Sequence, residues 1–468
     1  MTASPAGSRV FGTAVIINFL LDLGARLPTL ASLVPHRSRA LWQTPDSQRS
    51  LQFKRGNANL GIMARQTTPV EPTVAQRRDR AAWAWPFWPV VPLYPYGQRP
   101  TLMQEVVKET IWTFDQYQGI FYVVVPIRMT VVRLQPTGLL VYAPVAPTPE
   151  CIRQVRSLEA QYGPVRYIIQ STTTGIEHKV FVGPFARRFP QAQVYVAPYQ
   201  WSFPLDLPLS WLGLPRKRTQ VLSEGIRLPF ADQFDWATLG PIKLGLGPFV
   251  EVALFHRATR TLLLTDTLVS VPFTPPAVLN LDPYPLLFHA RDRADEPVVD
   301  TPENRRRGWH RIALFAFFFQ PSALNVPTLT QAFKDAKDAP DRSHRAYFGL
   351  YPFCWASNWQ TSFDALHGGG RPFVAPVLQT LILNRDRTVV KSWVTAVTQW
   401  QFERVIPCHL EAPITMGPTE FKAAFNFLDS EPPPGDRPLP AKEFEFLQTL
   451  DAGLVQRGIT PPAEPYTQ

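Results

Sequence analysis

Four polar residues in loops after apolar segments of the chain have side chains suited to metal binding. Glu177 and His178 come after the apolar run VRYIIQ, Asp266 ends TLLLTD, and His409 follows RVIP. In layered α/β proteins, the loops at strand ends carry ligands and catalytic groups. Two imidazoles and two carboxylates form a donor set for one zinc, iron or manganese ion. The sequence therefore predicts a metal site at these four residues, with the alternative that they are hydrogen-bonded structural groups.

The other chemistry-bearing residues lack this context. Cys408 adjoins His409, but nothing marks a Cys–His nucleophile pair, and we expect a buried, inert thiol. The glycine run HGGGR lacks the strand and lysine of a phosphate loop, and we interpret it as a turn. No cofactor-binding motif and no catalytic residue can be assigned. Four further histidines are expected to be surface or structural residues: His256, His310, His344 and His367.

The segments that must position the four residues alternate between strand and helix patterns. Hairpin-forming strands between Thr110 and Val145 precede TPECIRQVRSLEAQYG, which predicts a helix with Thr148 as N-cap and Gly163 at its end. VRYIIQ is then a buried strand, TTTGIEHK a loop, VFVGPFARRFP the start of a helix, and AQVYVAP another strand. Later, EVALFHRATRTLLLTD predicts two strands joined by a tight turn, TVVKSWVTAVTQW a helix, and FERVIPCH a strand entering a loop.

Composition indicates a packed protein with many rigid connections. Of 468 residues, 45% are hydrophobic, enough for a sizeable core, and 50 are proline, about twice the usual share. No stretch reaches the ~18 apolar residues that span a bilayer. Arginines beside IALFAFFF leave peripheral membrane contact open.

The net charge of +10 comes mainly from the N-terminal segment. Its first 65 residues hold eight Arg or Lys side chains against two Asp, with scattered Ser and Thr. This composition is typical of an organelle transit peptide, although a plain disordered arm fits equally well. A nucleic-acid partner is not expected, because the remaining chain is only mildly basic and shows no basic aromatic groove.

The order of the four residues resembles that of the metallo-β-lactamase-fold hydrolases, including glyoxalase II. The turn TTGIEH, the strand end LLTDTL and the loop VIPCH are similar to the family's metal-binding segments. The resemblance implies an αββα four-layer sandwich, of α/β (α+β) class, over roughly Thr110 to Leu428. It also implies that Glu177, His178, Asp266 and His409 correspond to the second of two metal sites.

The same resemblance implies that the first metal site is lost. Thr173 and Gly175 stand where two of its histidines would be, and the third falls near Gly247. The segments EHKVFVGPFARRFP, PLSWLGLP and IPCHLEAPI are more specifically similar to a family described by a domain of unknown function, found in cyanobacteria and plastids. This implies a plastid location, or the cytoplasm if the source is a cyanobacterium.

These observations predict a degenerate metallo-β-lactamase-like protein that is a mononuclear metal-dependent hydrolase; they do not identify its substrate, and a small molecule is one option. The alternative is a non-catalytic binding or assembly protein of the plastid that uses the same fold and no metal. The expected organisation is a disordered leader at 1–80, a Pro- and aromatic-rich extended strap at 81–109, domain halves at 110–273 and 374–430, an insertion at 274–373, and a Pro-rich linker with a C-terminal helix at 431–468.

Overall fold

The computed structural model describes residues 80–88, 93–173, 176–201, 209–210, 213–223, 225–245, 247–431, 433 and 438–466. The predicted leader therefore lies outside the described residues, apart from Arg80 at its end. Within the described part, no helix is long and apolar enough to cross a membrane.

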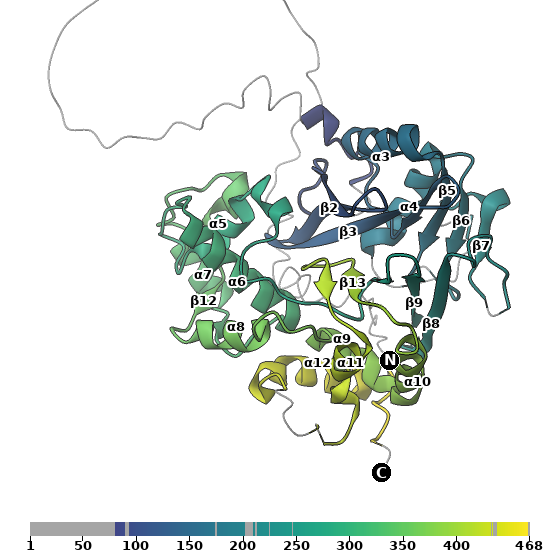
Figure 1. Ribbon diagram of the computed structural model, residues 1–468. Coiled ribbons are helices and arrows are strands. Elements are labelled where there is room, and N and C mark those ends of the chain that lie inside the picture. The colour runs from purple at the N-terminus through teal and green to yellow at the C-terminus, as the bar shows by residue number, and fades with distance from the viewer. Residues whose placement is uncertain are drawn as a thin grey trace, which may run out of the picture.

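The first half of the chain forms a seven-stranded sheet whose strands follow one another in sequence order (Figure 1). Strands β1 to β4 are antiparallel, and β4 to β7 are parallel. The last part of the segment predicted as an extended strap, 81–109, forms strand β1, which pairs with β2. The strands are β1 (Leu102–Val107), β2 (Ile111–Ile120), β3 (Val123–Arg133), β4 (Leu139–Tyr142), β5 (Val165–Gln170), β6 (Gln193–Val196) and β7 (Thr219–Val221).

A five-stranded sheet in the order β14-β13-β10-β9-β8 faces the first. Apolar side chains of both sheets form one buried cluster between them, including Leu140 and Ile169 from the first and Val252 and Leu263 from the second. The strands are β8 (Phe234–Lys243), β9 (Pro248–His256), β10 (Thr261–Leu264), β13 (Arg404–Pro407) and β14 (Ile414–Thr415).

Helices cover the outer face of each sheet. On the first sheet lie α3 (Pro149–Tyr162), with the predicted N-cap Thr148, and α4 (Ile176–Arg188), which pack through a second apolar cluster. On the second sheet lie α10 (Arg387–Val397) and α11 (Pro418–Ala423). The layers are thus helix, sheet, sheet, helix, and the predicted αββα sandwich is confirmed.

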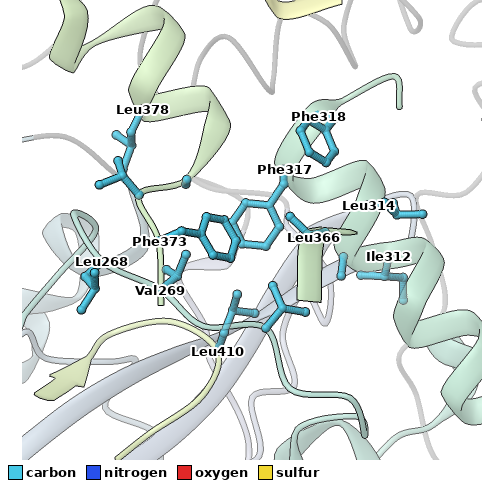
Figure 2. Packing of buried hydrophobic residues seen from close by; sticks show 14 of the residues in the cluster. Leu268, Val269, Ile312, Leu314, Phe317, Phe318, Leu366, Phe373, Leu378 and Leu410 are labelled. Carbon is cyan, nitrogen blue, oxygen red and sulfur yellow. The ribbon is translucent and has the colours of Figure 1, made fainter. Parts of the chain in front are cut away.

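The helices between the two halves gather on one side of the sandwich (Figure 1). They pack with α9 and the second sheet in the largest apolar cluster, where Phe317, Phe373 and Leu410 come together (Figure 2). The remaining elements are α5 (Tyr284–Ala290), α6 (Pro302–Phe318), α7 (Leu329–Asp335), α8 (Trp359–His367), α9 (Pro376–Leu381), α12 (Glu445–Gln456), and the short strands β11 (Leu324–Asn325) and β12 (Cys354–Trp355). Short 3-10 turns occur at Arg216–Arg218, Ala277–Asn280, His344–Gly349, Leu383–Arg385, Asn426–Leu428 and Ala441–Phe444.

Candidate functional site

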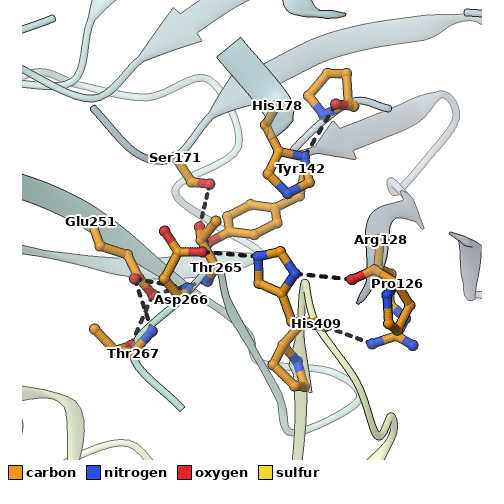
Figure 3. Close-up of polar contacts among 12 residues, drawn as sticks. Pro126, Arg128, Tyr142, Ser171, His178, Glu251, Thr265, Asp266, Thr267 and His409 are labelled. Carbon is orange, nitrogen blue, oxygen red and sulfur yellow. Dashed lines mark hydrogen bonds and ion pairs between the residues drawn. The ribbon is translucent and has the colours of Figure 1, made fainter. Parts of the chain in front are cut away.

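Asp266 and His409 meet because their strands are parallel neighbours. β10 pairs with β13 so that their last residues, Leu264 and Pro407, lie opposite each other. Asp266 and His409 each come two positions after these strand ends. His409 Nε2 lies 3.0 Å from Asp266 Oδ1 (Figure 3). The sequence placed both residues at strand ends, and the parallel pairing brings the two ends to the same edge.

The contacts of His409 require a hydrogen between its Nε2 atom and the Asp266 carboxylate. His409 Nδ1 lies 2.9 Å from the carbonyl oxygen of Pro126, which can only accept, so Nδ1 carries a hydrogen. The contact between Nε2 and Asp266 then requires either a protonated imidazole against a carboxylate, or a protonated Asp266 that donates to a neutral imidazole. In both forms, the carbonyl of Pro126 holds the ring so that Nε2 faces Asp266.

His178 reaches the same place from the first sheet. It lies in the first turn of α4, so the prediction that Glu177 and His178 belong to a loop is wrong: the helix begins at Ile176. The His178 side chain is buried, and its Nδ1 lies 3.2 Å from the carbonyl oxygen of Pro144. Its ring centroid lies 6.1 Å from that of His409.

The imidazole of His178 is neutral and has an unused lone pair. Burial, with a smaller contribution from His409, lowers the pKa of His178 to about 4. Since Nδ1 donates to a carbonyl, the lone pair is on Nε2, a buried atom without a hydrogen-bond partner. A buried acceptor left unpaired costs free energy, so this nitrogen is a candidate ligand atom.

The fourth predicted ligand, Glu177, is the second residue of α4, and its side chain lies outside the described residues. The structure therefore brings together His178, Asp266 and His409. Across the part of the chain that the structure describes, no group of three or more His, Cys, Asp or Glu side chains is arranged to hold a metal ion.

Glu251 supports the loop that carries Asp266, and the sequence analysis missed it. Its fully buried carboxylate accepts hydrogen bonds from the backbone N–H groups of Thr265, Asp266 and Thr267 at 2.9, 2.9 and 3.1 Å. It also accepts from the Thr267 hydroxyl at 2.9 Å. Burial and the charge of Asp266 raise the pKa of Glu251 to about 7. The sequence feature that could have indicated this role is the single carboxylate within the apolar segment FVEVALF.

Arg128 fixes the loop that carries His409. Its guanidinium pairs with Asp115 at 2.7 and 3.0 Å, and both side chains are buried. It also donates to the carbonyl oxygens of Pro407 and Leu410, on either side of His409, at 2.8 and 2.9 Å. A charged donor shared among these acceptors holds the loop rigidly against β3.

Hydroxyl groups tie the two sheets together beneath the site. The Thr265 hydroxyl lies 2.6 Å from that of Ser171 and 3.2 Å from that of Tyr142 (Figure 3). The Tyr142 hydroxyl also donates to the Val252 carbonyl at 2.8 Å. Residues that follow β5 and β10 are thereby linked to β4 and β9, so the strand ends keep a fixed spacing.

Two of the positions that the resemblance assigns to a first metal site, Thr173 and Gly247, are occupied by packing contacts. Thr173 accepts from the Val250 N–H at 2.9 Å and donates to the Pro248 carbonyl at 2.8 Å. A Cβ atom at Gly247 would lie 2.3 Å from the Trp201 ring, so a side chain there has no room. Gly175 lies outside the described residues.

The remaining predictions concern the isolated histidines and Cys408. His256 and His310, expected to be surface or structural residues, are buried and have structural contacts. His256 bonds to the Thr259 hydroxyl, and His310 stacks on Phe363. Cys408 is also buried, and burial raises the pKa of its thiol, which disfavours the nucleophilic thiolate.

Comparisons with solved structures find partial overlaps with metallo-β-lactamases and flavodiiron proteins. A metallo-β-lactamase from Pontibacter korlensis is 13% identical, with a TM-score of 0.26, covering 35% of this chain and 70% of that one. A metal-soaked Flv1 flavodiiron core from Synechocystis sp. is 10% identical, with a TM-score of 0.34, covering 70% and 61%. A flavo di-iron protein variant from Thermotoga maritima is 6% identical, with a TM-score of 0.35, covering 70% and 62%.

The layers and their order define an αββα sandwich. A family model described as "Domain of unknown function (DUF4336)" matches residues 108–427. The chain belongs to this family. The search of curated proteins gave no match.

Proposed function

We propose that the protein binds one divalent metal ion through His178, Asp266 and His409, with Glu177 as the fourth ligand, and acts as a mononuclear metal-dependent hydrolase. The observation that carries this proposal is the common setting of the two imidazoles. His178 Nδ1 contacts the backbone carbonyl oxygen of Pro144, and His409 Nδ1 contacts that of Pro126. Such a contact fixes the tautomer and ring orientation of metal-binding histidines.

The donor set also fits the charge and the chemistry of a divalent ion. Two neutral imidazoles and two carboxylates are ligands that zinc, iron and manganese all accept, and the two carboxylates neutralise the ion. When bound, such an ion polarises a carbonyl group and lowers the pKa of a bound water. Glu251 and Arg128 keep the Asp266 and His409 loops in place for this role.

A second candidate function is non-catalytic binding or assembly. It is favoured by the direct contact of Asp266 with His409, which satisfies both side chains without a metal. The filled first site, where Trp201 lies against Gly247, also supports it.

Reconstitution followed by hydrolysis assays separates the two functions. The protein would be loaded with zinc, iron or manganese and tested against small esters, thioesters and lactams. The hydrolase proposal expects turnover of one substrate class that falls at least about 100-fold in Asp266→Asn, since the negative charge of this ligand is lost. A matched control is His256→Gln, which alters a buried histidine away from the site and should keep full activity. Turnover that is equal in Asp266→Asn and wild type would refute the proposal.

A further inference from the structure

A cluster of exposed positive side chains lies where three parallel strands begin. β5, β6 and β7 are parallel neighbours, so their starts lie at one edge of the first sheet. The candidate metal site follows the other end of β5, at a distance of about 20 Å for a strand of this length. The exposed cations at the starting edge, which we call the basic face, are Arg156 of α3, Arg166 of β5, Arg187 and Arg188 of α4, and Arg216 and Lys217 before β7.

Contacts around the end of α4 join these segments into one surface. Arg156 of α3 donates a hydrogen bond to the carbonyl oxygen of Arg188, and its guanidinium lies 4.6 Å from the ring centroid of Phe189. From the segment before β7, the Arg218 guanidinium donates to three carbonyl oxygens at and after the end of α4, those of Ala186, Phe189 and Ala192. α3, the end of α4 and the start of β7 are therefore continuous.

The charge of the basic face is largely unneutralised. Among the described residues, Arg156 is the one member with a carboxylate partner, Glu159. The sequence from 149 to 223 holds nine Arg or Lys residues against four Asp or Glu. By contrast, α6 lies on the other side of the molecule (Figure 1), and most of its arginines have acidic partners: Arg305 pairs with Asp300, and Arg307 and Arg311 pair with Asp292. The arginines beside IALFAFFF are thus poorly suited to membrane contact.

Charge excludes two occupants that the chain itself could supply to the basic face. The first 65 residues hold eight Arg or Lys side chains against two Asp, so they would be repelled. A second copy that docks through the same surface in a symmetric dimer would bring two basic faces together. The face therefore fits a partner that carries many negative charges, such as the phosphate groups of a lipid surface or a nucleic acid.

The positions of exposed aromatic rings favour the lipid surface. Of the residues that the structure describes from 149 to 198 and from 213 to 223, none is an exposed large apolar side chain, so nucleic-acid bases would find no ring to stack on. Phe87 and Trp88, 49% and 39% exposed, instead lie beside Trp85, whose ring packs 5.3 Å from that of Phe181 in α4. Phe181 stands seven residues before Arg188, so both lie on one side of this helix. Aromatic rings beside cations are typical of proteins at a membrane interface.

A groove in the basic face has room for a headgroup. It has a volume of about 370 Å³ and lies between the starts of β5 and β6. Arg166, which has no carboxylate partner among the described residues, supplies its positive charge. The groove is lined by Pro164, Val165, Arg166, Tyr167, Gln191 and Gln193.

We propose that the basic face docks onto an anionic lipid surface. Its cations contact headgroup phosphates, one headgroup enters the groove, and Phe87 and Trp88 lie at the interface. The candidate metal site, at the opposite strand ends, lies away from the lipid. The docking does not depend on a bound metal or on hydrolysis.

Sedimentation of the full chain with vesicles tests the docking. Vesicles of phosphatidylcholine with about 30% phosphatidylglycerol are compared with vesicles of phosphatidylcholine alone, in about 0.1 M sodium chloride. We expect binding to the anionic vesicles at least about tenfold tighter than to the neutral ones, because the cations need negative headgroups. Binding should weaken as the salt concentration rises, because salt screens exposed charges.

Paired charge removals locate the contact on the protein. Arg187→Gln combined with Arg188→Gln removes two charges at the end of α4. Arg216→Gln combined with Lys217→Gln removes two before β7. Each pair should weaken binding to anionic vesicles at least about tenfold, because one cation near such a surface contributes about fivefold in affinity.

The basic N-terminal segment could also bind vesicles, so the control variant has a matched charge. Lys442→Gln combined with Arg457→Gln removes two exposed charges on either side of α12 and should bind like wild type. Modification of arginines by phenylglyoxal, mapped by mass spectrometry, gives a local measurement. Anionic vesicles should protect Arg188 and Arg216 at least about threefold and leave Arg457 reactive, because contact with headgroups shields a side chain from the reagent.

Three results would overturn the proposal. The first is equal binding of wild type to anionic and neutral vesicles. The second is a pair of folded variants at the end of α4 and before β7 that bind as tightly as the charge-matched control. The third is double-stranded RNA that binds the basic face more tightly than anionic vesicles at the same salt, which would assign this face to nucleic acid. If one paired variant does not fold, the other pair and the protection pattern decide.

Discussion

Glu251 shows how single residues set the candidate site. Three consecutive backbone N–H groups, from Thr265 to Thr267, point at one buried carboxylate. The backbone around Asp266 is thus fixed before any ligand binds. Without the carboxylate, these donors would be buried with no acceptor.

We expect Glu251→Ala to lower the free energy of unfolding by at least about 3 kcal/mol, because each buried N–H without an acceptor costs about 1–3 kcal/mol. Glu251→Gln should lose less, since one oxygen acceptor remains. Urea unfolding followed by circular dichroism would measure the change. The control is Glu403→Gln, which alters an exposed partner of Arg260 and should cost less than about 1 kcal/mol. Equal losses in Glu251→Ala and Glu403→Gln would show that the carboxylate does not hold the loop.

Sequence reasoning found the site residues that stand at strand ends, and missed those that act from inside strands. Asp266 and His409 are visible because a polar residue directly follows an apolar run. Glu251 and Arg128 lie within β9 and β3, where the residue type does not tell which face or loop a side chain reaches. That information comes from the pairing of strands distant in sequence, such as β10 with β13.

Among the elements, the helices between the two halves depend on close backbone contacts. α5 and α6 approach so closely that a Cβ atom at Gly308 would lie 1.7 Å from the Leu286 carbonyl oxygen. α6 in turn packs against β3. Phe121, between β2 and β3, stacks on Tyr347 of the 3-10 turn His344–Gly349, with ring centroids 4.1 Å apart. The sequence predicted a largely helical segment here, but not this contact, because a glycine inside a helix has no pattern that indicates its neighbour.

We expect Gly308→Ala to destabilise the protein by about 1–3 kcal/mol, because the added methyl group pushes α5 and α6 apart. The matched control is Gly453→Ala in α12, where a Cβ atom meets nothing within 4 Å. Alanine favours the helix there, so the control should stabilise by up to about 1 kcal/mol. Thermal unfolding of both variants measures the difference. Gly308→Ala with an unchanged or higher unfolding temperature would contradict the close packing of α5 on α6.

At the scale of the whole molecule, buried histidines make stability depend on pH. Burial lowers the pKa of His289 from 6.5 to about 3, and that of His256 and His310 to about 4. As pH falls below 6.5, the unfolded chain takes up protons at these residues and the folded chain does not. These histidines therefore contribute a decrease in the free energy of unfolding between about pH 6.5 and pH 4, and the raised pKa of Glu251, about 7, opposes part of it.

We expect the slope of this decrease to be smaller in His289→Gln, by up to about 1.4 kcal/mol per pH unit, because one proton fewer is taken up on unfolding. Urea unfolding at pH values from 7 to 4 would give the slope for both proteins. The comparison of slopes is valid even if the variant is less stable at every pH. Identical slopes would mean that His289 titrates alike in the folded and unfolded chains.

The N-terminal segment bears on where the whole molecule is located. We propose that residues 1 to about 75 direct the protein to plastids, on the basis of their basic, acid-poor composition. A fluorescent reporter fused to this segment should enter plastids in a plastid-bearing cell. A reporter that stays in the cytosol would contradict the targeting role and leave the fold and site unaffected.

The content of bound metal tests the central claim most directly. Wild-type protein reconstituted with zinc, iron or manganese should retain one equivalent after dialysis, measured by mass spectrometry of the element. His178→Ala and His409→Ala, each with an unchanged circular dichroism spectrum, should retain none, because each loses one of the two imidazole ligands. Wild-type protein that retains no metal, or folded variants that retain a full equivalent, would contradict a metal site at His178, Asp266 and His409.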